Sequence, residues 1–170
     1  MKTRTPGLLA VTIATGLATA LFALPASAEE PAMVSVKRLS LTTALKIAQG
    51  AVKACTGKGI QIGATVVDRS GVVQVALRDT IAAPITLEVS RMKAFTAVNF
   101  NSATSAMAER ANTPVGRVAG LVMSGGGLPI QVGGSLVGAV GVSGAPSGDT
   151  DEQCAQAGVD AVMDELEMGM

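Results

Sequence analysis

The stretch Ile60–Leu77, with the sequence IQIGATVVDRSGVVQVAL, decides the fold class of this chain. Two runs rich in Val and Ile, residues 60–67 and 72–77, flank the tetrapeptide Asp68–Gly71. β-branched residues favour strands, and Asp at the first and Gly at the fourth position suit a type I turn. The stretch therefore predicts an antiparallel β-hairpin.

A second hairpin is predicted in the C-terminal half of the chain. Residues 128–132 and 136–142 form two short runs rich in apolar residues, with Gly133-Gly134 between them. Both glycines can adopt the positive φ angles that a two-residue hairpin turn requires. The preceding residues Ser124–Gly127 are expected to form a flexible loop.

Helices are predicted around the two hairpins, over residues 41–56, 85–99, 104–111 and 150–166. Ser40 is the expected N-cap of the first helix. The apolar residues of that helix recur at helical spacing and are Leu41, Ala44, Leu45, Ala48, Val52 and Cys55. Because the order of elements contains no repeated strand–helix–strand unit, it favours an α/β fold of the α+β kind. Such a fold has an antiparallel sheet flanked by helices, unlike a doubly wound parallel sheet.

Residues 1–28 carry the pattern of a secretory signal peptide. Lys2 and Arg4 precede the uncharged run Leu8–Leu24, and the sequence Ala-Ser-Ala at 26–28 places small residues at a cleavage site. An uncleaved anchor is the alternative, but the run is shorter than the ~20 residues of a membrane span. We expect cleavage after residue 28 and a single domain over residues 29–170. That domain would be periplasmic or secreted and would have no membrane span.

Composition excludes several classes of function. Removal of residues 1–28 leaves 11 of the 13 basic residues against 13 acidic ones, which does not fit a nucleic-acid-binding protein. The chain has no Trp or Tyr on which bases could stack, and it has no His. The absence of His excludes Ser-His-Asp and Cys-His catalysis, His-ligated zinc and His-ligated haem. We predict no metal site and no catalytic residue, so a binding protein is favoured over an enzyme.

The first and last predicted helices carry opposite charges. Residues 46–58 include three lysines and no acid, whereas residues 149–170 include seven acids and no base. This pattern favours neighbouring helices, within one subunit or between subunits; two separately solvated faces are the alternative. Cys55 and Cys154 lie on these helices, and in an exported protein such a pair predicts a disulfide. Two buried cysteines that never meet are the other interpretation.

Six short motifs follow one another along the chain: Val66–Gly71, Arg78-Asp79, Arg91–Ala97, Gly125–Ile130, Gly138–Gly144 and Asp151–Gly158. In this order and spacing, the chain resembles the GlcG/HbpS family, which includes extracellular haem-binding proteins and the C-terminal domain of PduO. The resemblance covers nearly all of residues 29–170. It implies a profilin-like fold with a five-stranded antiparallel sheet between helices, and assembly into a homo-oligomer.

The resemblance also implies a function, namely the binding of haem or a related tetrapyrrole. Since His is absent, the axial group would be Met, Lys, Cys or Thr, or the haem would be held by packing and by propionate contacts. Some family members work with a sensor kinase, so a sensor or membrane protein is a further expected partner. The alternatives are an enzyme acting on a small organic acid, with Lys93 and Asp79 as its polar pair, and an oligomeric interaction module without a ligand.

The candidate ligand-binding residues come from the only basic stretch besides the first helix and from the glycine-rich loop. Residues 69–117 contain six bases and three acids, and Arg suits the carboxylates of an anionic ligand. Backbone N–H groups of the loop could hold an anion, although a hinge into the next strand is the other interpretation. For each single base, ordinary surface charge is also an alternative. The candidates are Arg78, Asp79, Arg91, Lys93, Thr96, Ser124, Gly125, Gly126 and Gly127.

Overall fold

The computed structural model describes residues 31–169 of the chain, and the predicted signal peptide over residues 1–28 lies outside this range. All helices and strands belong to the compact unit that begins at Ser35. In chain order they are α1 (Leu41–Thr56), β1 (Gly63–Asp68), β2 (Val73–Arg78), α2 (Ile85–Phe100), the 3₁₀ helices η1 (Ser105–Asn112) and η2 (Pro114–Arg117), β3 (Gly127–Val132), β4 (Ser135–Ser143), α3 (Gly148–Asp160) and α4 (Met163–Met168).

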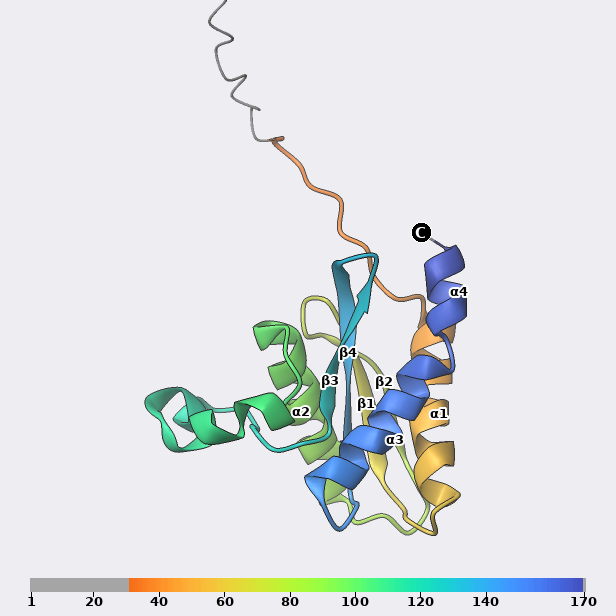
Figure 1. Ribbon diagram of the computed structural model, residues 1–170, viewed down its shortest axis with the longest axis vertical. Coiled ribbons are helices and arrows are strands. Elements are labelled where there is room, and N and C mark those ends of the chain that lie inside the picture. The colour runs from red at the N-terminus through yellow and green to blue at the C-terminus, as the bar shows by residue number, and fades with distance from the viewer. Residues whose placement is uncertain (1–30, 170) are drawn as a thin grey trace, which may run out of the picture. The chain divides into compact units, whose positions relative to one another are not determined.

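Both predicted hairpins are present, and they join into one antiparallel sheet with the strand order β2-β1-β4-β3 (Figure 1). The first strand of one hairpin pairs with the second strand of the other, from Gly63 opposite Ser143 to Asp68 opposite Gly138. The central strand β1 is buried at all six positions. The edges of the sheet are therefore β2 and β3.

The expectation of a fifth strand is wrong, because the sheet formed by residues 31–169 has four strands. The two hairpins account for these four, and the fifth was implied by the family resemblance alone. The long segment between α2 and β3, where a short helix was predicted over residues 104–111, folds into the two 3₁₀ helices η1 and η2. Pro114 begins the second of them, and Gly120 has a φ of +88°, so this segment lacks the continuous extended backbone of a strand.

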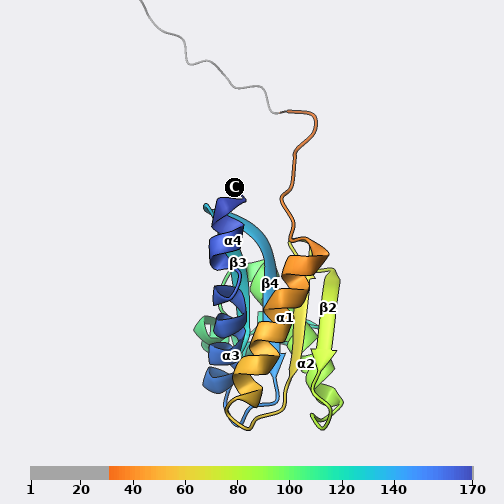
Figure 2. The same ribbon diagram turned by 90° about the vertical axis from the view of Figure 1, so that its right-hand side faces the viewer.

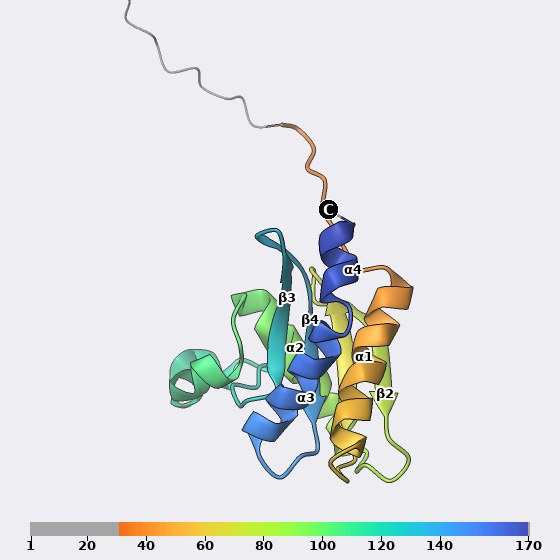
Figure 3. The same ribbon diagram turned by 45° about the vertical axis from the view of Figure 1, so that its right-hand side comes forward.

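Helices cover both faces of the sheet. Helix α2 packs on one face against β1, β3 and β4, whereas α1 and α3 lie side by side on the other (Figures 2 and 3). On the α2 face, a Cβ at Gly141 would come within 2.0 Å of Ser90 O. Gly127, the cross-strand partner of Gly141, would likewise clash with Lys93 O at 2.5 Å. These two glycines let the backbone of α2 lie directly on the strands.

Helix α1 has the predicted bounds, and Ser40 Oγ caps it by accepting a hydrogen bond from Thr43 N at 3.1 Å. Its buried face is shifted from the predicted stripe, because Leu41 and Leu45 are exposed. The buried residues are mostly small, namely Thr43, Ala44, Ile47, Ala48, Ala51 and Cys55. This narrow face permits a close approach to α3.

The last predicted helix is broken into two. Helix α3 begins after Ser147, whose Oγ accepts a hydrogen bond from Thr150 N, and it ends at Asp160. Val162 then leaves the helical conformation, with φ −127° and ψ −1°, and is 2% exposed. Burial of this side chain in the core explains why the chain does not continue as one helix to residue 166.

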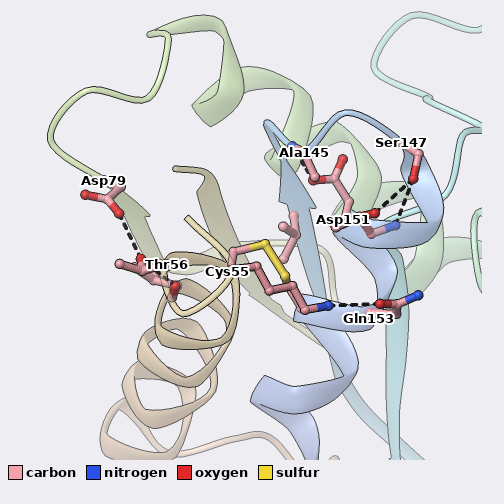
Figure 4. Close-up of a disulfide and its surroundings, with 12 residues drawn as sticks. Cys55, Thr56, Asp79, Ala145, Ser147, Asp151 and Gln153 are labelled. Carbon is pink, nitrogen blue, oxygen red and sulfur yellow. Dashed lines mark hydrogen bonds between the residues drawn. A yellow bond between two sulfur atoms is a disulfide. The ribbon is translucent and has the colours of Figure 1, made fainter. Parts of the chain in front are cut away.

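The predicted contact between the oppositely charged helices is confirmed. Cys55 and Cys154 form a disulfide that joins α1 to α3, with their Cα atoms 5.6 Å apart (Figure 4). Lys46 Nζ lies 2.6 Å from Glu165 Oε2, and Lys58 Nζ donates a hydrogen bond to Gln153 Oε1 at 2.9 Å. The charge pattern and the cysteine pair therefore correctly indicated that the first and last helices of the chain are neighbours within one subunit.

The two ends of the folded unit lie together. Residues 37–40 line one groove with Leu166 and Gly169 at the end of α4, and with Val132 and Val137 near the β3–β4 turn. None of the helices within residues 31–169 is long and apolar enough to cross a membrane.

Candidate functional site

Lys93 places its ammonium group inside the protein. Its Nζ lies 2.8 Å from Asp151 Oδ2 and donates a hydrogen bond to Val142 O at 3.0 Å. The side chains of Lys93 and Asp151 are 4% and 5% exposed. Because α2 and α3 lie on opposite faces, this buried ion pair connects the two helical layers of the protein.

Gly126 allows this connection. A Cβ at this position would lie 2.8 Å from Lys93 Nζ and 2.7 Å from Val142 O, and the φ of Gly126 is +119°. Its N–H donates to Glu152 Oε2 at 3.3 Å, and Ser105 Oγ donates to the other oxygen of Glu152 at 2.9 Å. The glycine-rich loop thus binds an anion, but the anion is a carboxylate of the same chain.

The other residues of the predicted loop and of α2 complete this cluster. Thr96 Oγ1 donates to Met92 O and accepts from Val122 N at 2.9 Å, which fixes the segment returning from η2. Gly127 N donates to Thr104 Oγ1 at 2.8 Å, whereas Ser124 is exposed at the edge of the cluster. Gly125 packs so closely on Gly148 that a Cβ would come within 2.9 Å. Lys93 and its neighbours therefore form a buried, internally satisfied polar cluster.

Arg78 and Asp79 lie elsewhere, beside a groove of about 650 Å³ between α1 and the end of β2. Thr56 Oγ1 donates to Asp79 Oδ2 at 3.0 Å and so bridges the two walls of the groove (Figure 4). Arg78 Nη1 donates to the carbonyl oxygens of Asp79, Thr80 and Ala82, which orders the loop after β2. The lining residues are Gln49, Val52, Lys53, Thr56, Gly57, Leu77, Arg78, Asp79 and Thr80.

Lys53 is a groove residue that was not among the sequence candidates. It is exposed in the last turn of α1, and its ammonium group has no hydrogen bond or ion pair among residues 31–169. The run of lysines in the first helix was the available signal. It was interpreted only as a sign of helix pairing, because the sequence does not show that β2 ends beside this turn.

Arg91 lies at a third place, on the α2 side of the sheet. There it lines a small groove together with Glu88, Leu87, Thr65, Val73 and Ala76. The structure therefore divides the candidate residues among a buried cluster, the α1–β2 groove and the α2–β2 groove. The Lys93–Asp79 pair that the alternative enzyme hypothesis requires is not formed, since Lys93 pairs with Asp151 and Asp79 accepts from Thr56 and Thr80.

Comparison with known families adds to this geometry. A family model described as haem degrading protein HbpS-like matches residues 39–160. The chain belongs to this family. The crystal structure of a double mutant of Streptomyces reticuli HbpS is 37% identical and has a TM-score of 0.74, covering 82% of this chain and 97% of that one. No curated protein matches the chain.

Two further solved structures are similar. The crystal structure of a PduOC complex with haem is 25% identical over 73% of this chain and 94% of that one, with a TM-score of 0.68. The Klebsiella pneumoniae protein ORFY is 24% identical over 78% of this chain and 96% of that one, with a TM-score of 0.73. The second similarity supports the fold alone.

The α1–β2 groove fits a haem better than the buried cluster does. Both cysteines are in the disulfide, so neither can supply a thiolate, and Lys93 is already paired inside the protein. The groove combines apolar Val52 and Leu77 with the cations Lys53 and Arg78. Its volume is within the roughly 300–1,000 Å³ of typical ligand pockets. Lys53, Thr56 and Thr80 belong to the residue types expected as axial groups.

Proposed function

We propose that this chain is an exported protein that binds haem or a related tetrapyrrole in the groove between α1 and β2. One observation carries the choice of site, namely that the groove places two cations beside an apolar wall. A tetrapyrrole has the matching chemistry, with a flat apolar ring and carboxylate side chains. Lys53 and Arg78 would bind the carboxylates, and Val52 and Leu77 would contact the ring.

The walls of this groove are held in place before any ligand arrives. The Thr56–Asp79 hydrogen bond joins α1 to the loop after β2, and the disulfide at Cys55 fixes the adjacent end of α1 on α3. A preorganised site loses less conformational entropy on binding. The same bond occupies one oxygen of Asp79, while Thr80 N donates to the other at 2.7 Å, so this carboxylate is turned to the protein.

The positions of Lys93 and Asp79 support ligand binding over catalysis. Lys93, the base of the enzyme hypothesis, is buried and paired with Asp151, and Asp79 lies in a different region. A solvent-accessible pair able to transfer protons is therefore not formed by these two residues. An oligomeric interaction module without a ligand stays a separate prediction, which the binding experiment also tests.

Haem titration of the exported protein tests this function. We expect a saturable shift of the Soret band, and we expect Lys53→Glu to weaken binding by about tenfold or more, because the variant replaces an attraction to a carboxylate with a repulsion. Arg110→Glu is the matched control, since it reverses an exposed charge in η1, outside the groove, and should leave the affinity unchanged. Absence of any shift in the wild-type protein would contradict haem binding. Equal weakening by both variants would contradict the placement in the groove.

The location and the mass of the expressed protein test whether it is exported and cleaved. Expression of the full chain in a Gram-negative host should yield a periplasmic product whose mass corresponds to a chain that begins at Glu29. A product that retains residues 1–28 and stays in the cytoplasm would contradict both the signal peptide and the oxidising compartment that the disulfide requires.

A further inference from the structure

Helix α2 leaves the edge strand β2 largely uncovered. The helix packs mainly on β1, β3 and β4, so the side of β2 that faces the α2 layer borders solvent instead of a helix. The α2–β2 groove lies there and has a volume of about 280 Å³. This volume is near the lower end of the range for ligand pockets, so the groove suits a small molecule and is too small for a tetrapyrrole.

The register of the sheet gives this groove an apolar floor. Thr65 of β1 and Ala76 of β2 are cross-strand partners, so their side chains lie on the same face of the sheet. Thr65 Oγ1 is 2.8 Å from Ser90 Oγ of α2, which places this face on the α2 side and satisfies the buried hydroxyl. Leu87 of α2 lines the groove from the helix. The surface that remains open to a ligand is therefore hydrocarbon.

The bulge in β2 adds a further apolar wall. Gln74 is the extra residue in the pairing of β2 with β1, and its Nε2 donates to Leu39 O, just before α1, at 2.9 Å. Val75 packs in the core on the same side of the sheet. Because these two successive residues face the α1 layer, Val73 turns to the α2 layer, where it is 42% exposed and lines the groove. Bulges beside functional sites often redirect a side chain in this way.

Two charges of opposite sign border this apolar surface. Glu88 and Arg91 are exposed, lie three residues apart on α2 and both line the groove. Among residues 31–169, neither of these side chains has an ion pair or a hydrogen bond. Residues at this spacing share one face of a helix and are close enough to pair with each other, yet here both charges remain available to a ligand.

We propose that the α2–β2 groove binds a free α-amino acid with an aliphatic side chain, such as leucine. An α-amino acid carries an ammonium group and a carboxylate on one carbon atom, which matches two opposite charges on one face of a helix. Arg91 would donate to the carboxylate, and Glu88 would accept from the ammonium group. Val73, Ala76 and Leu87 would contact the aliphatic side chain. This site is separate from the proposed tetrapyrrole groove and does not depend on it.

Titration of the haem-free protein with leucine, followed by the NMR signals of the backbone amides, tests the proposal. We expect saturable shifts at Val73, Ala76 and Leu87. Isocaproate lacks the ammonium group and isoamylamine lacks the carboxylate, so each should bind the wild-type protein about fivefold or more weakly than leucine. Glu88→Gln should weaken leucine binding to a similar extent and leave isocaproate binding unchanged. Arg91→Gln should weaken leucine binding and leave isoamylamine binding unchanged.

Glu109→Gln and Arg110→Gln are the matched controls, because they remove the same charges from exposed positions of η1 and should leave leucine binding unchanged. Ala76→Leu fills the groove from its floor and should abolish the shifts, and circular dichroism establishes that each variant is folded. Absence of saturable shifts in the wild-type protein at millimolar leucine would overturn the proposal. So would equal affinity for leucine and its two singly charged analogues, a comparison that needs no variant, or equal weakening by the groove variants and the controls.

Discussion

A single side chain, Lys93, ties the two helical layers of this protein together. Lys93→Met would leave the Asp151 carboxylate buried without its charged partner. We expect the free energy of unfolding to fall by about 3–5 kcal/mol, the usual cost of removing one member of a buried ion pair. Denaturant titration followed by circular dichroism measures this change.

Two further variants test whether loss of the Lys93–Asp151 ion pair causes this loss of stability. Lys93→Met/Asp151→Leu removes both charges and should recover most of the lost stability. Arg91→Met, an exposed change two residues away on the same helix, should alter stability by less than about 0.5 kcal/mol. A double variant less stable than either single one would contradict the buried-pair explanation.

Gly158 is a second position at which a single added carbon atom should change the stability of the protein. A Cβ here would lie 2.4 Å from Ile47 O, at the point where α3 crosses α1 near Gly50. Although Ala favours helices more than Gly does, we expect Gly158→Ala to lower the free energy of unfolding by about 1–3 kcal/mol, because the helices must move apart. Gly57→Ala is the control, since its Cβ would meet nothing closer than 3.4 Å. A stabilised Gly158→Ala variant would contradict the close crossing.

At the scale of the elements, the disulfide is the covalent link between α1 and α3. It joins cysteines 99 residues apart, so it restricts the unfolded chain over most of the domain. We expect Cys55→Ala/Cys154→Ala to lower the free energy of unfolding by about 2–4 kcal/mol. Denaturant titrations of this variant and of the reduced wild-type protein should agree. Coincident curves for the oxidised and reduced wild-type protein would show that the link contributes nothing.

The elements that local sequence specifies were predicted well. Asp68–Gly71 and Gly133-Gly134 fixed both hairpins, and α1 has its predicted bounds. The break after Asp160 was missed because it depends on Val162 packing into a core that the last helix does not itself contain. The fifth strand was inferred from a family resemblance, and the chain's own hairpins provide four.

The candidate site was harder to predict, because it depends on pairs that are distant in sequence. Lys93 was predicted to bind a ligand, yet it is buried and paired with Asp151, which is 58 residues away in the sequence and was predicted only as a member of the acidic last helix. Lys53 was overlooked for the same reason, since its role at the groove depends on where β2 ends. Residue type could indicate chemistry here, but only the topology brings the residues together.

At the scale of the whole molecule, we expect the two helical layers to unfold together and the segment formed by η1 and η2 to unfold independently of them. The 3₁₀ helices η1 and η2 pack mainly on each other and project from the body (Figure 1). We expect native-state hydrogen exchange to be slow and of similar free energy in α2 and α3, which Lys93 and Asp151 connect, and much faster in residues 105–117. Equal protection of residues 105–117 and α2 would contradict this division.

The groove shared by residues 37–40 and the end of α4 has a consequence for how the polypeptide can be rearranged. With both ends of the folded unit at one place, a short linker could join them, and the chain could be reopened at the exposed Gly133-Gly134 turn. A circular permutant made in this way should keep every strand pairing and the disulfide. The linear order of the gene would then prove to be one of several that encode the same architecture.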